Sequence, residues 1–512
     1  MDEEFHDRVT QQWIEKMRQT KTPRTLTKVL REATFSPLRF AETGEVVDED
    51  FKMGLLRHIG AGCKELSRGV VLRGLEEKSA GDLALELLEL WKANGYNGRY
   101  DWIANSVAVL GDDRSALELE RCIHQWQKNT SSTWRKKAAG LIYLFDRMDT
   151  PTSLMVLVGL THSQDVPTVY DAAVYALQRA AKKRAMTWHE LSDSVIPDCG
   201  LDARGTRIFE LGDDVRLKLV LDREFEPVLR DEKTREIYDS PLDYPDGGGV
   251  DPEKKRQAVH QWELMLARLR ELITIQTRRM EEVMVNGRLW HRDRFEELIL
   301  RHPLMVNFAR SLVWGVYDAN HNLIVTFRAS EEGDLMDVED AEVELAADHV
   351  VGLVHPVDLS VGLCQKWADS LADYEVFAPF EQLGRQVYLP DDAILNEREE
   401  ADPTPGQMYT SKALRAVMKR EAWRRDTDGG HIRTFFFKPF DAHDLSAYVH
   451  FSPGLNAGGE SWDEDQSIVS IKFKPFKRGA HHRVLREVPL VCYSEARRFL
   501  ELVKAEQESS GV

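Results

Sequence analysis

The chain has 512 residues, of which 42% are hydrophobic, and it carries 68 Lys and Arg against 86 Asp and Glu. This length predicts about three structural units, and the apolar content excludes a chain that is disordered throughout. The net charge of −18 repels a phosphate backbone over most of the surface, so general nucleic-acid binding is disfavoured.

The cysteines and the first residues bear on the compartment. The five cysteines are far apart and form no CxxC pair: Cys63, Cys122, Cys199, Cys364 and Cys492. Their spacing predicts neither a disulfide framework nor a zinc knuckle. Residues 1–6 are acidic where a signal peptide is basic, and no run approaches the ~20 apolar residues of a membrane span. We therefore expect a soluble cytoplasmic protein that does not bind membranes.

Residues 1–195 are predicted to be a helical region with HEAT-like repeats. Three segments match at a constant offset of 34 residues: 102–110, 136–144 and 170–178. A small residue recurs in each segment, and a bulky residue follows it three positions later: Ala104 and Val107, Ala138 and Leu141, Ala172 and Tyr175. This pattern is typical of stacked helix pairs, and we expect all these positions to be core. An ordinary helical bundle with coincident spacing is the alternative.

The next two regions differ in their predicted secondary structure. Residues 196–250 predict a small β meander, with strands over 207–211 and 215–221, followed by a linker from Pro241 to Asp251. Residues 251–310 predict long helices that lead into the C-terminal domain. The first helix carries an apolar stripe interrupted by one polar residue: Trp262, Leu266, Leu269, Ile273, Gln276, Met280 and Val283. Arginines and glutamates flank this stripe at helical pairing distances, which favours a solvated, salt-bridged face over a phosphate-binding patch: Arg268, Arg270, Arg278, Arg279, Glu263, Glu271, Glu281 and Glu282.

Residues 311–512 predict a mixed domain, so the fold class of the whole chain is expected to be α+β. Five segments are strand-like: 312–317, 323–327, 349–354, 433–437 and 467–473. Helices are expected near Trp367 and Val417. The stretch from Asp391 to Pro405 holds six carboxylates against one arginine, which predicts a mobile acidic loop.

A family resemblance covers about residues 255 to 500 of the sequence. It rests on an ordered series of motifs: 302–304, 312–318, 327–328, 351–356, 373–385, 428–430 and 491–496. Together they resemble the bacterial family called domain of unknown function 4132, which includes proteins described as molybdate-metabolism regulators. Family members often carry a separate WGR domain, but here Trp314-Gly315 is followed by Val316 within a predicted strand. A nucleic-acid or ADP-ribosylation role that depends on that domain is therefore not expected.

The resemblance also implies a cellular setting. The genes of this family commonly lie beside those of a MoxR-type AAA+ ATPase, a von Willebrand A-type protein and a SWIM zinc-finger protein. That arrangement implies partners of these three kinds and work within a multi-protein assembly, by analogy alone.

His355, Glu375 and Arg385 are the candidate catalytic residues. His355 ends a predicted apolar strand near Asp358, where it is either a general base or a strand cap bonded to a backbone carbonyl; His302 has the same two interpretations. The cluster of Asp373, Tyr374, Glu375, Gln382 and Arg385 lies among the aromatic residues Trp367, Phe377, Phe380 and Tyr388. It is either a buried network, with Asp373 or Glu375 as the partner of Arg385, or a site for a carboxylated or phosphorylated ligand.

Other motifs give weaker signals. The glycine-rich segment 454–461 lacks the lysine of a Walker loop, and His443, His450, His481 and His482 have no metal-ligand spacing. Residues 331–348 hold nine carboxylates without an EF-hand pattern, which favours a solvated hairpin over a calcium site. We expect no cofactor and no metal.

These features favour a non-catalytic regulatory or scaffold protein that acts through protein–protein contacts. One alternative is an enzyme or small-ligand-binding protein with its site in the C-terminal domain. A nucleic-acid-associated factor is the other alternative, and it needs a local basic patch on this acidic chain.

Overall fold

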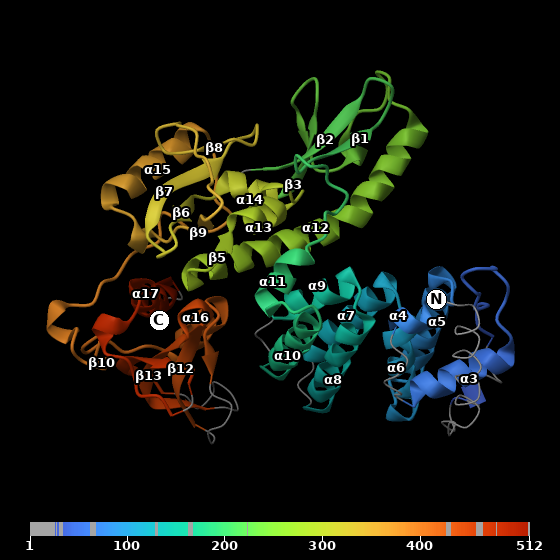
Figure 1. Cartoon of the computed structure of the whole chain (residues 1–512), viewed down its shortest axis with the longest axis horizontal. Helices are drawn as coiled ribbons and strands as arrows, with labels where there is room; N and C mark the ends of the chain where they lie inside the picture. The colour runs from blue at the N-terminus through green and yellow to red at the C-terminus, as the bar shows by residue number, and fades with distance from the viewer. Residues whose placement is uncertain are drawn as a thin grey trace. The chain divides into compact units, whose positions relative to one another are not determined.

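The computed structural model describes most of the chain (Figure 1): residues 26, 28–29, 34–61, 68–128, 132–161, 167–222, 224–425, 432–456, 464–477 and 479–509. Several features noted in the sequence lie outside these residues: positions 1–6, Cys63, residues 428–430 and residues 457–461. The chain forms two compact units, Met1–Pro197 and Asp198–Val512. The first is helical and the second combines helices with antiparallel sheets, so the fold is α+β.

The described part of the first unit consists of short and medium helices. They are α3 (Glu49–Gly60), α4 (Arg68–Val71), α5 (Glu77–Ala93), η1 (Gly98–Tyr100), α6 (Trp102–Leu110), α7 (Asp113–Gln127), α8 (Ser132–Met148), α9 (Pro151–Leu160), α10 (Pro167–Lys183) and α11 (Trp188–Ser194). Polar side chains define where several of them begin. The Asp112 carboxylate accepts two backbone N–H groups at the start of α7, and Thr150 forms a capping box at the start of α9.

The three matching segments of the sequence lie on α6, α8 and α10. Helix α6 packs against α8 and α8 against α10, while α5 packs against α7 and α7 against α9. Val107, Leu141 and Ala172 are buried as expected, but Tyr175 is 54% exposed, so its prediction as core is wrong. The buried face of α10 is formed by Ala173, Ala176, Leu177 and Ala180, and at 100° per residue Tyr175 points away from that face.

The second unit begins with a four-stranded antiparallel meander in the order β1-β2-β3-β4. Its elements are β1 (Arg207–Glu210), β2 (Arg216–Leu221), β3 (Pro227–Asp231), β4 (Ile237–Tyr238) and the short helix η2 (Pro241–Asp243). The segment expected as a linker lies against this meander, because Val250 forms a β-bridge with Gly212.

The long helix α12 (Pro252–Asn286) follows the meander. The Asp251 carboxylate caps its start, and Gly287 ends it with a φ of 63°, a conformation that glycine adopts readily. Most of the predicted stripe is buried, including Trp262, Leu269 and Met280. The helix packs against β1, β3, β9 and α17, so the stripe faces several elements rather than one partner helix.

The first five-stranded sheet has the order β5-β9-β6-β7-β8 and is antiparallel. Its strands and helices are β5 (Leu289–His291), α13 (Arg292–Phe295), the π-helical turn η3 (Glu296–Leu300), α14 (Met305–Ser311), β6 (Trp314–Tyr317), β7 (Leu323–Ala329), β8 (Leu335–Met336), β9 (Val350–Leu353), η4 (Pro356–Asp358) and α15 (Val361–Asp373). Phe295 of α13 packs on Trp314 and Phe327, while Trp367 of α15 bonds to Thr326. Because Thr326 and Phe327 point to opposite faces, helices cover both faces of this sheet.

The second five-stranded sheet has the order β10-β14-β13-β12-β11 and is also antiparallel. Its elements are η5 (Asp392–Ile394), β10 (Glu399–Ala401), α16 (Ser411–Arg420), β11 (Arg424–Arg425), β12 (Ile432–Phe440), η6 (Asp441–His443), β13 (Leu445–Asn456), β14 (Ser467–Pro475), η7 (Leu485–Glu487) and α17 (Leu490–Ser509). Helices α16 and α17 lie on the same side of it (Figure 1).

Two predictions fail at this sheet. The expected loop from Asp391 to Pro405 contains the edge strand β10, whose Glu399 is paired with Lys472 on β14. This cross-strand pair neutralises part of the charge that made the segment look like a loop. The central strand β13 is absent from the predicted strands, although its residues 445–451 alternate between buried and partly exposed positions near their end. Within the described residues, every helix is too short or too polar to cross a lipid bilayer.

Candidate functional site

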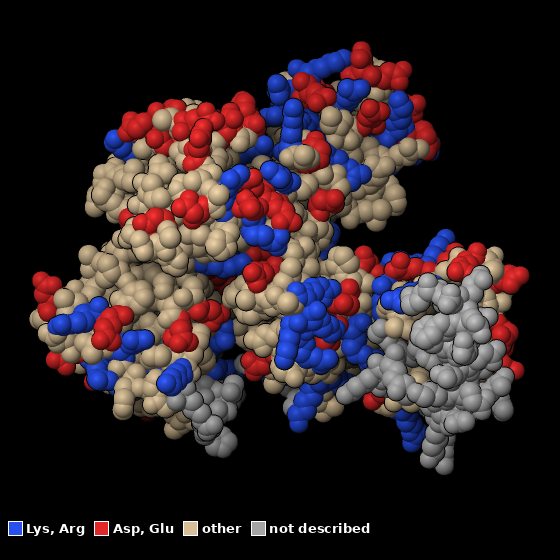
Figure 2. Space-filling view, in the orientation of Figure 1, with Lys and Arg blue, Asp and Glu red and all other residues tan. Residues whose placement is uncertain are grey.

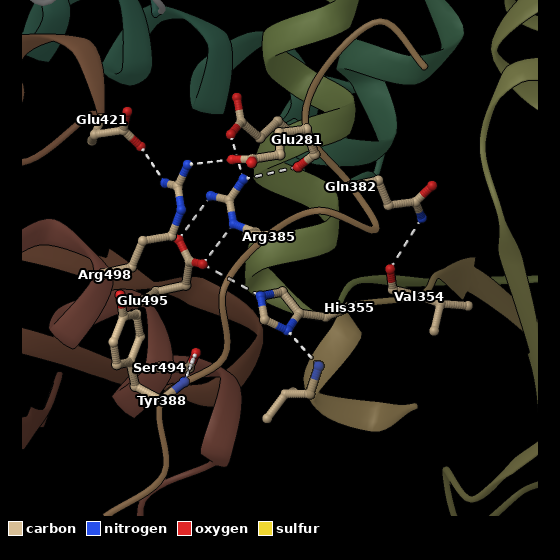
Figure 3. Close-up of polar contacts among 12 residues, drawn as sticks. Glu281, Val354, His355, Gln382, Arg385, Tyr388, Glu421, Ser494, Glu495 and Arg498 are labelled. Carbon is tan, nitrogen blue, oxygen red and sulfur yellow. Dashed lines mark hydrogen bonds and ion pairs between the residues drawn. The ribbon is translucent and has the colours of Figure 1, made fainter. Parts of the chain in front are cut away.

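Arg385 is the centre of a buried ionic network (Figure 3). Its side chain is 1% exposed. Its Nε and Nη2 atoms donate to the two carboxylate oxygens of Glu495, at 2.7 and 2.8 Å. Its Nη1 atom donates to Glu281 Oε1 at 2.7 Å. A guanidinium held by a bidentate carboxylate and a second carboxylate is the strongest pairing available to an arginine.

Three distant segments supply these groups. Glu281 is on α12, Arg385 is on the coil after α15, and Glu495 is on the first turns of α17. The network therefore fixes the position of α12 and α17 relative to the coil between the two sheets. Each carboxylate is more than 100 residues from Arg385 in the sequence, by 104 and 110 positions.

Glu495 is a buried carboxylate that remains ionised. It is 3% exposed, and burial alone would raise its pKa. The hydrogen bonds from Arg385 and His355 outweigh burial and hold the pKa of Glu495 well below its ordinary value. Burial lowers the pKa of Arg385, but its bonds to Glu495 and the charge of Glu281 reverse that effect and raise it. The pair is therefore charged on both sides at neutral pH.

His355 joins the same carboxylate from the end of β9. It is 1% exposed, and its Nε2 atom lies 3.3 Å from Glu495 Oε1. Its Nδ1 atom accepts the backbone N–H of Val357 at 3.1 Å and so caps η4. Because Nδ1 accepts, the neutral ring carries its proton on Nε2 and donates it to Glu495. His355 lies just after the end of β9, but it accepts a backbone N–H where the prediction gives a bond to a backbone carbonyl, and its carboxylate partner is Glu495 rather than Asp358.

The Gln382 side chain forms hydrogen bonds with backbone groups in the way that a neighbouring strand would. Its Nε2 atom donates to the carbonyls of Val313 and Val354, at 2.8 and 3.0 Å. Its Oε1 atom accepts the N–H of Val313 at 2.9 Å. Gln382 is 2% exposed, so these bonds satisfy backbone groups that water does not reach. It holds the coil that carries Arg385 against the first sheet.

Arg498 extends the network toward the surface. On α17, its Nη1 atom donates to Glu421 at 2.9 Å and its Nη2 atom to Glu381 at 3.2 Å. One residue before Glu495, the Ser494 hydroxyl accepts the N–H of Tyr388 at 3.0 Å. These contacts add further links between α17 and the coil at residues 381–388 (Figure 3).

Glu375 lies apart from this network. Asp373, Tyr374 and Glu375 are exposed at the end of α15, so the prediction that they share one buried cluster with Gln382 and Arg385 is wrong. The prediction that Asp373 or Glu375 pairs with Arg385 is wrong as well. Glu281 and Glu495 occupy that role because α12 and α17 bring them to the guanidinium, while the helix end turns residues 373–375 outward.

A groove of about 500 Å³ lies beside α15, next to the network. Leu371, Val376, Phe377 and Phe380 supply apolar walls, and Glu375 lines it as well. Arg385 does not line this groove. A ligand in the groove would therefore meet carboxylates and aromatic rings rather than the buried guanidinium.

The structure also places three other features noted in the sequence: His302, the acidic segment 331–348 and the cysteines. The ring of His302 accepts the N–H groups of Leu304 and Met305, which places it at the start of α14. The acidic segment 331–348 contains β8 and a bridge between Met336 and Glu342, and Figure 2 shows acidic side chains gathered over the region of β8 and α15. In the described part of the chain, no group of His, Cys, Asp or Glu is arranged to hold a metal ion. Cys122, Cys199, Cys364 and Cys492 are unbridged.

Comparison with known proteins finds a family match for part of the chain. Residues 250–423 match the family described as Domain of unknown function (DUF4132). The chain is also 26% identical over 387 residues to the uncharacterized protein YehI of Escherichia coli (strain K12). That match covers 73% of this chain and only 30% of the relative, so the chain spans less than a third of that protein's length. No solved structure matches the chain.

Glu281, His355 and Arg385 fall inside the family match, whereas Glu495 follows it. The buried network therefore connects the matched region to the C-terminal helix.

Proposed function

We propose that this chain is a non-catalytic regulatory or scaffold protein that acts through contacts with other proteins. The observation that supports it best is the state of the two strongest catalytic candidates. His355 and Arg385 are buried, and both are bonded to Glu495. A general base or an anion-binding arginine must reach a substrate, and these side chains direct polar atoms at Glu495 of the same chain.

The helical unit supplies a surface suited to such a role. We propose that α5 to α10 form a HEAT-like array, since α6, α8 and α10 pack in succession and α5, α7 and α9 do the same. Arrays of this kind bind other chains along extended surfaces. The exposed pair of Tyr143 and Tyr175, with rings 6.1 Å apart, lies on successive helices of one layer.

The proposed setting is a cytoplasmic assembly built around a MoxR-type AAA+ ATPase, with a von Willebrand A-type and a SWIM zinc-finger protein as further partners. This part rests on the family resemblance. It is tested by mixing the purified full chain with the purified ATPase from the same organism. We expect one co-eluting complex of fixed stoichiometry and a changed ATPase rate; separate elution at physiological salt, with an unchanged rate, would contradict the proposal.

A matched pair of variants connects the test to the helical surface. Tyr175→Ser removes an exposed ring from α10 and should weaken the complex while the fold is kept. Tyr374→Ser removes a similarly exposed ring from the second unit and should leave the complex unchanged.

The groove beside α15 supports a second candidate, a small-ligand site. Its apolar walls suit a ligand with an apolar body, and Glu375 is one of the polar residues that line it. Thermal-shift screening of such compounds tests it. A stabilisation that Glu375→Gln abolishes and Lys366→Gln leaves intact would favour this function over the scaffold.

A further inference from the structure

The second five-stranded sheet has one face covered by helices and one face that carries aromatic and basic side chains. Phe436 of β12 packs on Phe499 of α17, so Phe436 points to the covered face. Successive side chains of a strand alternate, and Phe435 and Phe437 therefore point to the opposite face. The same alternation holds on β14, where Ile471 and Phe473 are buried while Lys472 and Lys474 are partly exposed.

One row of side chains crosses this open face from edge to edge. Each strand contributes one residue, and neighbours in the row are paired across the strands: Arg424, Phe437, Tyr448, Lys472 and Glu399. The next row pairs Phe435 with His450, and the row on the other side pairs Ser446 with Lys474. Side chains in one row point to the same face of the sheet.

Four rings lie together on this face and form an aromatic platform: Phe435, Phe437, Tyr448 and His450. Phe437 and Tyr448 are stacked with ring centroids 5.8 Å apart and planes 23° apart. Tyr448 and His450 are stacked at 6.4 Å and 22°. The ring of Phe435 is tilted against both neighbours, with its centroid 5.6 Å from that of Tyr448 at 58° and 5.3 Å from that of His450 at 45°. Four rings thus lie side by side and partly exposed, on a face that offers π-surfaces to a planar ligand.

The charge around the platform is opposite to that of the chain as a whole. In the three rows, Arg424, Lys472 and Lys474 stand against the single carboxylate of Glu399. Along the sequence, residues 467–486 contain six Lys or Arg and no Asp or Glu. At physiological ionic strength the Debye length is about 8 Å, so charges on the sheet dominate the potential there over carboxylates elsewhere.

We infer that this face binds single-stranded nucleic acid, with bases stacked on the four rings and phosphates held by the flanking cations. This goes beyond the proposed scaffold function and does not depend on it. Rings and cations arranged together match a strand that alternates flat bases and phosphates. An acidic peptide would need the cations only, and duplex DNA hides the faces of its bases inside the stack.

The net charge of −18 still disfavours nucleic-acid binding over most of the surface. This face of the second sheet is the local exception that we infer. Binding confined to one face predicts a small number of phosphate contacts. The affinity should therefore fall only slowly as the salt concentration rises. In a plot of log affinity against log salt concentration, each phosphate contact contributes about −0.7 to the slope.

The test uses the full chain and fluorescent oligouridylate and oligodeoxyuridylate of about ten nucleotides, which differ only in the 2′-hydroxyl, read by anisotropy at ~50 mM salt. We expect saturable binding to the single strands and weaker binding to a duplex of equal length. Equal affinity for both single strands means that the 2′-hydroxyl is not read, and a preference for oligouridylate identifies RNA as the ligand. Tyr448→Ala should weaken binding about tenfold. Lys474→Gln should reduce the salt slope by about 0.7.

Tyr175→Ala on α10 is the matched control, because it removes an exposed ring that lies beside an arginine in the other unit. It should leave the affinity unchanged. If Tyr448→Ala does not fold, Phe437→Leu takes its place with the same expectation. Three outcomes overturn the inference: no binding at low salt, wild-type affinity in a folded platform variant, or displacement of the oligonucleotide by polyglutamate at equal charge.

Discussion

The two five-stranded sheets of the second unit are both antiparallel, yet they are covered to different extents. On β6, at the centre of the first sheet, all four residues from Trp314 to Tyr317 are buried. On β12 of the second sheet, buried and partly exposed residues alternate. The first sheet has helices on both faces, and the second has α16 and α17 on one side (Figure 1).

The difference shows where each sheet can bind. A sheet enclosed on both sides uses its side chains for packing, and its polar groups must be satisfied from within. Gln382 and Arg385 do this at the edge of the first sheet, where their partners are backbone groups and carboxylates of the same chain. The face of the second sheet opposite α16 and α17 keeps partly exposed side chains, such as Tyr448 and Phe437.

Removal of Arg385 gives the largest effect expected from the enclosed region. Arg385→Ala leaves Glu495 buried without its bidentate partner, and Glu281 loses its contact too. Breaking a buried pair on one side costs about 3–5 kcal/mol in the free energy of unfolding. Urea denaturation followed by circular dichroism measures this loss.

The control for Arg385→Ala is an exposed ion pair in the same unit. Lys366 and Glu339 form a contact in which both side chains are more than half exposed. Lys366→Ala should leave the urea midpoint unchanged. A loss below about 1 kcal/mol for Arg385→Ala would mean that the network contributes little to the enclosed region.

A matched pair of ring substitutions tests the comparison of the sheets directly. Trp367 is fully buried, and its Nε1 atom donates to Thr326 at 2.7 Å. Trp367→Phe leaves a cavity and an unpaired buried hydroxyl, at a cost of about 2 kcal/mol. Phe437→Leu on the open face should cost less than about 1 kcal/mol. Equal losses in urea denaturation would show that the second sheet is covered as fully as the first.

The sequence predicted elements better than it predicted partners. The helix α12 was expected because its apolar residues recur at helical spacing, and the strands β6, β7 and β9 because they are rich in β-branched residues. Such patterns are local, and they survive folding because each element buries its own apolar side. The edge strand β10 was missed because its composition is acidic. Its pairing with the basic strand β14 depends on the tertiary fold, which the local sequence does not show.

The candidate site was predicted only in part for the same reason. Arg385 and Gln382 are predicted from the rule that polar groups among aromatic residues must be satisfied or functional, and His355 from its place at the end of an apolar strand. Glu281 was assigned to a solvated face because arginines flank it on the helix, and Glu495 was not singled out at all. No local spacing connects residues more than 100 positions apart, so their partnership with Arg385 required the fold. The aromatic platform was missed likewise, because half of it lies on the unpredicted strand β13.

The loss of stability at acidic pH is expected to be smaller than the effect of Arg385→Ala or Trp367→Phe, and it reports on the network alone. The pKa of Glu495 is held well below its ordinary value in the folded chain, so its ionised form stabilises the fold above the unfolded pKa of about 4.3. That contribution is lost as the pH falls toward the folded pKa. Between pH 7 and about pH 3.3 the loss from this group is about 1.4 kcal/mol. Glu495→Gln removes the titration, and other carboxylates cancel in the difference between the two proteins. We therefore expect a shallower decline of the unfolding free energy for Glu495→Gln, measured by urea denaturation at a series of pH values; parallel declines would show that Glu495 is not held ionised by Arg385 and His355.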